Sequence, residues 1–195
     1  MLLEASILQE LLDPWKYKGG VILDVGCGKG RFGHLLGSYS ELLVGCDLHH
    51  PYLRWVKKKV GSYDDVVRCD SSKLPFRDKC FNASVSVEVI EHLPKEKGFE
   101  MLSEMERVSL NLVVVVTPNV EGPGETEPQL AHKSSWKAKD FKKLGYVVRG
   151  SGFKYSSLVK RSLKVEVGLV VTILSFYLTP LATILNAWKY LKKPY

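Results

Sequence analysis

The sequence predicts an α/β fold: a doubly wound, mostly parallel Rossmann-like sheet of six to seven strands with helices on both faces. Short apolar runs alternate with segments of helical periodicity, which is typical of right-handed βαβ units. The β-branched run Val113–Val116 suits a strand buried on both faces of a parallel sheet. A glycine-rich turn follows the first apolar run, at the strand end where such sheets bind ligands.

The elements of the first half follow in order. Residues 1–14 read as a short amphipathic helix stopped by Pro14, not as a signal peptide, because acids replace the basic start. We then expect strands over 21–23, 42–47, 66–67 and 83–87, with helices over 32–36 and 51–60 between them.

The second half continues the alternation. A helix is predicted over 95–108, where apolar residues recur at i, i+3 spacing, and a strand over 112–116. After a Gly- and Pro-rich loop over 119–132, Ser134 or Ser135 can cap a helix that runs to Leu144. We expect a sixth strand over 146–153 and a seventh over 163–167.

The turn after the first strand contains three glycines, Gly26, Gly28 and Gly30. Glycine is needed where the backbone takes positive φ or lets a ligand approach closely. The N–H groups at the start of the following helix would face the ligand. Because Gly28, Gly30 and Gly33 also satisfy G-x-G-x-x-G, the loop alone does not separate a dinucleotide from another nucleotide.

Two further acids follow later strands. Asp47 ends the second strand, nineteen residues after Gly28, and suits a carboxylate that accepts hydrogen bonds from a ribose diol. Asp70 follows the third strand and suits an amino group on an adenine edge. This second acid is not part of the dinucleotide fingerprint, so it disfavours a nicotinamide oxidoreductase.

Four stretches between residues 21 and 153 resemble one family: LDVGCGKG, VGCDLHHPYL, CDSSKLPFRDKCFNASVSVEVIEHL and VVVVTPN. Together they resemble the class I S-adenosylmethionine (SAM)-dependent methyltransferases, and within them the type 11 group. The resemblance implies SAM as cofactor and S-adenosylhomocysteine (SAH) as product. It assigns cofactor contacts to Asp24, Gly26, Cys27, Gly28, Gly30, Asp47, Leu48, Asp70, Ser71, Val87 and Glu88.

The resemblance also implies residues on the acceptor side. His92 is a candidate general base, with Glu91 beside it, and a purely structural histidine is the alternative. His132 and Trp136 are expected to line the acceptor pocket or to cap the following helix. No metal site is expected, because the four cysteines lack C-x-x-C spacing and His49–His50 has no partner at ligand spacing.

Charge and hydropathy divide the chain into a methyltransferase domain over 1–162 and an apolar, lysine-flanked helical segment over 163–195. Residues 132–195 carry a formal charge of +11 and residues 1–131 carry −4, which indicates an acidic partner surface. Residues 167–188 contain no charge. Their length permits a transmembrane helix, and they also suit contact with an anionic membrane surface, or two short helices packed on the domain.

These observations predict an enzyme that transfers a methyl group from SAM to a small-molecule or lipid-like acceptor. RNA is the alternative acceptor and ranks lower, because only charge supports it. A catalytically silent binding module that keeps the fold is a further alternative. Scattered cysteines and the absence of a signal peptide predict a cytoplasmic protein, with possible attachment to a membrane. The sequence does not fix the oligomeric state.

Overall fold

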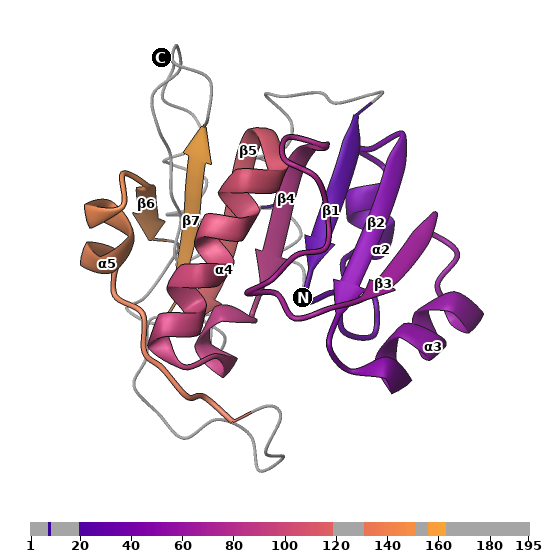
Figure 1. Cartoon of the computed structure of the whole chain (residues 1–195), viewed down its shortest axis with the longest axis horizontal. Helices are drawn as coiled ribbons and strands as arrows, with labels where there is room; N and C mark the ends of the chain where they lie inside the picture. Colours follow the sequence, from indigo (N-terminus) through magenta and orange to yellow (C-terminus); the bar gives the residue numbers. More distant parts are fainter. Residues whose placement is uncertain (1–7, 9–19, 119–130, 151–155, 163–195) are drawn as a thin grey trace, which may run out of the picture.

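The fold is a seven-stranded sheet between two layers of helices (Figure 1). The computed structural model describes residues 8, 20–118, 131–150 and 156–162. The strands are β1 (Val21–Val25), β2 (Leu42–Asp47), β3 (Asp65–Arg68), β4 (Phe81–Val87), β5 (Ser109–Pro118), β6 (Val147–Gly150) and β7 (Ser156–Ser162). Their order across the sheet is β3-β2-β1-β4-β5-β7-β6.

Strands β1 to β5 pair in parallel, which confirms the predicted Rossmann-like parallel sheet. Strand β7 instead runs antiparallel to both β5 and β6. The central strands β1, β4 and β5 are buried on both faces, as the valine run of β5 predicts. Because they are parallel, their carboxyl ends lie at one edge of the sheet, the lower edge in Figure 1.

Helices cover both faces of the sheet, as predicted. They are α2 (Gly33–Gly37), α3 (His50–Lys59), the 3-10 helix η2 (Ile90–His92), α4 (Lys95–Val108) and α5 (Ala138–Lys143). Helix α4 buries Met101, Leu102 and Met105 in one core cluster with Val113 and Val115 of β5. Leu36 of α2 lies in the cluster on the opposite face, with alternate residues of β1, β4 and β5.

Two elements differ from the prediction. A strand occupies Ser156–Ser162, where none is predicted, and the strand predicted over 163–167 lies outside the described residues. Helix α5 begins at Ala138, not after Ser134 or Ser135. Ser134 does not cap it, because its hydroxyl donates to the Leu93 carbonyl at 2.7 Å and its N–H to the Glu91 carbonyl at 3.1 Å. This pairing holds the residues before α5 in an extended path.

The predicted amphipathic helix over 1–14, apart from the buried and helical Leu8, lies outside the described residues. The predicted apolar segment over 163–195 also lies outside them, so its membrane contact and the division of the chain at residue 162 stay predictions. Within the part of the chain that the structure describes, no helix is long and apolar enough to cross a membrane.

Candidate functional site

The glycine loop after β1 has the conformation that its sequence predicts. Gly26, Gly28 and Gly30 have φ values of 74°, 54° and 79°. The loop is closed by a hydrogen bond from the Gly30 N–H to the Cys27 carbonyl at 2.8 Å. A Cβ atom placed on Gly28 would meet nothing within 4 Å, so the backbone here faces open space that a ligand can approach.

Asp47 joins the glycine loop to the end of β2. Its Oδ2 accepts a hydrogen bond from the Gly28 N–H at 2.9 Å, and its Oδ1 accepts one from the His49 N–H at 2.7 Å. A carboxylate has about four acceptor positions, so two backbone donors leave it capacity for hydroxyl groups of a ligand. These two bonds hold the carboxylate beside the glycine loop, the position in which it is predicted to accept hydrogen bonds from a ribose.

Asp24 lies behind the loop, with only 3% of its surface exposed. The Tyr63 hydroxyl donates a hydrogen bond to its Oδ2 at 2.6 Å. Burial raises the pKa of Asp24 to about 7, the Tyr63 bond opposes that shift, and nearby Asp47 adds to it. Tyr63 was not predicted as a site residue, because it precedes β3 and no local motif links it to β1.

Three other predicted cofactor contacts lie in the glycine loop, after β2 and after β3. Cys27 is buried, and burial together with Asp24 and Asp47 raises its thiol pKa, which disfavours a reactive thiolate. Leu48 is 62% exposed directly after β2. Beyond β3, Asp70 accepts hydrogen bonds from the N–H and hydroxyl of Ser72, both at 2.8 Å. Burial raises the pKa of Asp70, but these bonds and two lysines outweigh it and lower the pKa.

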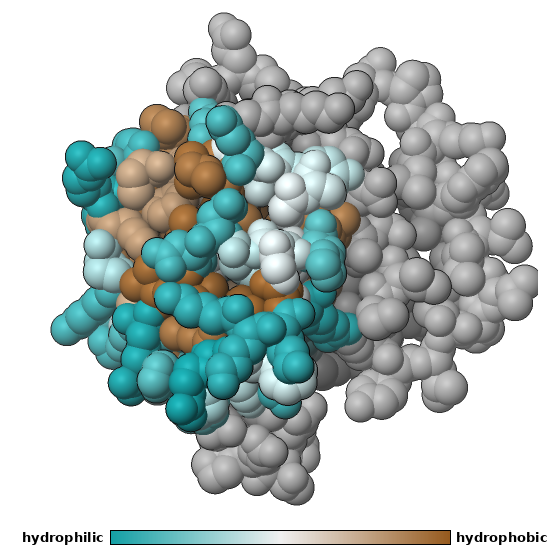
Figure 2. Space-filling model, turned by 90° about the vertical axis from the view of Figure 1, so that its right-hand side faces the viewer, coloured by the Kyte–Doolittle hydropathy of each residue, from teal (hydrophilic) through white to brown (hydrophobic). Residues whose placement is uncertain are grey.

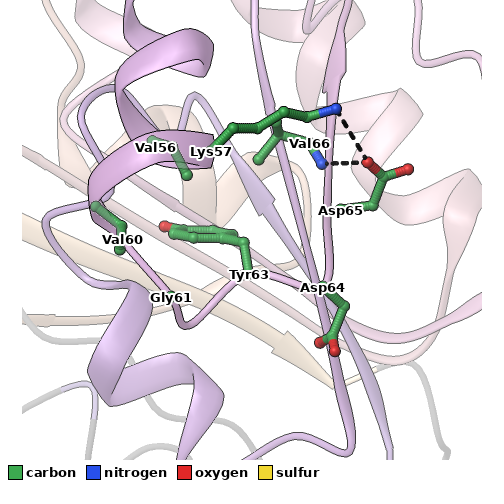
Figure 3. A pocket seen from close by; sticks show the side chains of 8 residues that line it. All are labelled: Val56, Lys57, Val60, Gly61, Tyr63, Asp64, Asp65 and Val66. Atoms are coloured by element: carbon green, nitrogen blue, oxygen red, sulfur yellow. Dashed lines mark hydrogen bonds and ion pairs between the residues drawn. The ribbon is translucent and has the colours of Figure 1, made fainter.

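A pocket of about 290 Å³ lies between α3 and the start of β3, away from the carboxyl ends of the strands (Figure 3). It is lined by Val56, Lys57, Val60, Gly61, Tyr63, Asp64, Asp65 and Val66. Several lining residues adjoin the glycine loop: Val56 and Val66 pack in one core cluster with Cys27, and Val60 and Tyr63 lie beside Gly30. The pocket therefore lies behind the loop, on the side of α3 and Tyr63.

The residues predicted for the acceptor side lie beyond the ends of β4 and β5. Glu88 follows β4 with a φ of 57°, a strained value for a residue with a side chain. Glu91 in η2 is 2% exposed, and the Thr117 hydroxyl of β5 donates to its Oε2 at 2.9 Å. Burial raises the pKa of Glu91 to about 7, while hydrogen bonding to its own backbone, Thr117 and Glu88 opposes the rise.

Both predicted acceptor-side histidines lie beside Glu91. The His92 and His132 ring centroids are 5.2 Å apart, and His92 Nδ1 lies 3.3 Å from the Ala131 carbonyl. Ligand atoms of Glu91, His92 and His132 all lie within 4.8 Å of one another. Sequence separation hides this grouping, because His132 is forty residues from His92 and no fixed spacing links them.

Trp136 lies apart from these histidines. It is 1% exposed and packs against Phe99 and Phe141, with the Lys95 ammonium 3.7 Å from its ring centroid. The structure gives this indole a packing role, so its contact with an acceptor stays a prediction. The same holds for the catalytic roles of Glu91 and His92 and for the individual cofactor contacts.

Comparison with known proteins identifies the domain. Residues 23–111 match a family model described as "Methyltransferase domain". The chain is 34% identical over 91 residues to a tRNA (carboxymethyluridine(34)-5-O)-methyltransferase of Arabidopsis thaliana, covering 46% of this chain and 21% of that protein. It is 35% identical over 91 residues to the probable tRNA methyltransferase 9B of Homo sapiens, covering 46% and 19%.

A more distant relative is a probable 18S rRNA (guanine-N(7))-methyltransferase of Dictyostelium discoideum, 29% identical over 80 residues, which cover 41% of this chain and 28% of that protein. The matched region thus spans about a fifth to a quarter of these relatives.

Solved structures share the fold at low identity. A protein of Pyrococcus horikoshii has a TM-score of 0.68 and 20% identity, over 83% of this chain and 90% of that chain. The magnesium protoporphyrin IX methyltransferase of Synechocystis with bound SAH has a TM-score of 0.60 and 16% identity, over 80% of both chains.

Proposed function

Residues 23–111 form a class I SAM-dependent methyltransferase domain of the type 11 group, and from this premise we propose that the chain methylates RNA with SAM as the donor. This proposal reverses the order of acceptors expected from the sequence, where a small or lipid-like molecule came first. The three relatives named above carry tRNA or rRNA in their names. That agreement among separate relatives is the observation that carries the choice of RNA.

The geometry of the glycine loop supports SAM as the cofactor. The open space at Gly28 suits close approach of the methionine part, and Asp47 suits the ribose hydroxyls. Asp70 would face the adenine amino group. When bound, SAM supplies a methyl group already activated by the sulfonium charge, so the protein mainly has to align donor and acceptor.

The surface of α3 supports a polyanionic acceptor. Helix α3 starts three residues after Asp47 and exposes four cations, Arg54 and, in its last turn, Lys57, Lys58 and Lys59. Trp55 is 50% exposed among them. Hydrophilic residues cover the lower part of this side of the molecule, at the height of α3 (Figure 2). Cations that follow a backbone, with an aromatic ring on which a base stacks, suit single-stranded RNA.

The decisive experiment offers the purified chain radiolabelled SAM with total RNA, a lipid extract and a metabolite extract in parallel. We expect label in the RNA fraction that ribonuclease releases. Asp47→Ala should weaken SAM binding roughly tenfold to a hundredfold, because hydrogen bonds to a charged group contribute about 1.5–3 kcal/mol. Asp65→Ala, on an exposed side chain outside the loop, is the matched control.

The acceptor surface is tested by charge removal. Arg54→Gln with Lys58→Gln should lower the slope of log affinity for RNA against log salt by about 0.7–0.9 per charge removed. Lys142→Gln with Lys143→Gln, on the exposed side of α5, removes the same charge elsewhere and should leave the slope unchanged. Label in the lipid or metabolite fraction would instead support the small-molecule or lipid-like acceptor expected from the sequence. SAM binding without methyl transfer to any fraction would indicate a catalytically silent binding module.

A further inference from the structure

We propose that Glu91, His92 and His132 form a binding site for one divalent transition-metal cation. No such site is expected from the sequence, whose cysteines and adjacent histidines lack ligand spacing. The structure brings one carboxylate and two imidazoles together from η2 and from the segment before α5, with ligand atoms within 4.8 Å of one another. Two histidines with one carboxylate are a ligand set for divalent first-row metals.

A buried carboxylate oxygen points to a ligand at this place. Glu91 is 2% exposed, and its Oε2 is bound by Thr117. Its Oε1 is buried and has no hydrogen-bond partner among the residues that the structure describes. A carboxylate oxygen buried without a hydrogen-bond partner is costly, and a cation bound there would offset that cost.

The histidine on η2 is oriented as metal-binding histidines are. A ligating imidazole usually donates its other N–H to a backbone carbonyl or a carboxylate, which fixes the ring and its tautomer. His92 Nδ1 lies 3.3 Å from the Ala131 carbonyl. When Nδ1 carries the proton in this bond, the lone pair lies on Nε2, the nitrogen that would bind the cation.

Backbone hydrogen bonds hold the third ligand beside the other two. The Glu91 carbonyl accepts the N–H groups of Lys133 at 2.8 Å and Ser134 at 3.1 Å. His132 is adjacent to this pairing, so its position follows from the residue that supplies the carboxylate. Two ligands on a tetrahedral cation lie about 3.4 Å apart at a metal–nitrogen distance of about 2.1 Å. Closing the site from 4.8 Å therefore needs the farthest ligand atoms to approach each other by roughly 1–1.5 Å.

Three protein ligands leave coordination positions open, as in catalytic metal sites. The site lies beyond the end of β4, next to the segment that the family resemblance assigns to the acceptor. An oxygen atom of the acceptor would take one open position. This role rests on the proposed function, whereas binding of the cation itself does not.

The test titrates the full-length chain, stripped of metal by a chelator, with Co²⁺ and follows its visible absorption, with neither SAM nor RNA present. We expect saturable binding of one Co²⁺ per chain. Loss of a group that only hydrogen-bonds to a metal ligand already costs about 10–100-fold in affinity. His132→Ala and Glu91→Gln, which each remove a ligand atom, should therefore weaken Co²⁺ binding at least roughly a hundredfold. His34→Ala removes an exposed histidine on α2 and should bind Co²⁺ as the wild type does.

Circular dichroism and SAM binding establish that each variant is folded, and His132→Gln, of similar size, replaces His132→Ala if that variant is not. Pulsed electron paramagnetic resonance of the Mn²⁺-loaded wild type should show couplings to imidazole nitrogen. Absence of saturable Co²⁺ binding, or equal affinity in wild type and a folded His132 variant, overturns the proposal. Failure to methylate RNA would leave the cation site standing, since it is measured without either substrate.

Discussion

At the ends of β1 and β2 the candidate site consists of backbone N–H groups and one carboxylate, whereas beyond the ends of β4 and β5 it consists of side chains, one buried and two half-buried. The first half is organised by the Gly28 N–H to Asp47 bond at 2.9 Å around open space. The second half holds Glu91 at 2% exposure between two histidines. The glycine loop with Asp47 resembles a preformed binding site for a ligand. The cluster of Glu91, His92 and His132 resembles a polar site that a bound cation would complete.

This difference explains why one half could be predicted and the other could not. A glycine loop encodes its shape in consecutive residues, because positive φ is a local property. The histidine cluster depends on a hydrogen-bonded approach of residues 131–136 to η2, which no periodicity records. Three measurements probe the two halves separately.

The largest effect is expected from alanine at two glycines of the same loop. A Cβ on Gly26 would collide with the Val89 side chain, whereas one on Gly28 meets nothing. Gly26→Ala should lower the free energy of unfolding by about 2–5 kcal/mol, from left-handed backbone strain and overpacking. Gly28→Ala should lower it by only about 1–2 kcal/mol but abolish SAM binding. Urea unfolding measures the stability of each variant, and calorimetry measures its affinity for SAM. Normal SAM binding by Gly28→Ala would show that the ligand does not approach the backbone at Gly28.

A smaller effect is expected from the pH dependence of stability. The pKa of Asp24 is about 7 in the folded chain against 3.8 when solvated. Between these values the folded state keeps a proton that the unfolded chain has lost, so stability falls as the pH rises through this range. The loss is up to about 4 kcal/mol and is complete above the folded pKa.

Asp24→Asn should flatten this part of the profile, and Tyr63→Phe should move it to higher pH by removing the hydrogen bond that lowers the Asp24 pKa. Denaturant unfolding across the range measures all three proteins. A profile that is the same in wild type and Asp24→Asn would mean that Asp24 does not titrate in the folded chain.

The smallest effect is expected on the acceptor side, from Ser134→Ala. The Ser134 hydroxyl accepts the Trp136 indole N–H at 2.9 Å and donates to the Leu93 carbonyl. Its loss leaves a buried donor unpaired and should lower the free energy of unfolding by about 1–3 kcal/mol. SAM affinity, measured by calorimetry, should not change, because the glycine loop is not touched. Weakened SAM binding would show that the two halves are coupled.

Residue patterns predicted the elements that depend on local periodicity. Helix α4 has the predicted bounds, Lys95–Val108, because its apolar residues repeat along one face. The predicted start of α5 was wrong. Serine is a common helix cap, but the N–H and hydroxyl of Ser134 donate hydrogen bonds to the carbonyls of Glu91 in η2 and of Leu93 instead. Strand β7 was not predicted, because the sequence of a strand that returns antiparallel between β5 and β6 carries no signal of its pairing.

The position of β7 has a consequence for synthesis of the chain. Strand β5 is rich in valine, and one of its edges is covered only when Ser156–Ser162 pairs with it over its length. Until these residues leave the ribosome, a long β-branched strand presents an open edge, which is a template for intermolecular pairing. Chain ends placed before Ser156 should therefore yield aggregates rather than a smaller soluble domain, although every predicted cofactor contact would be present.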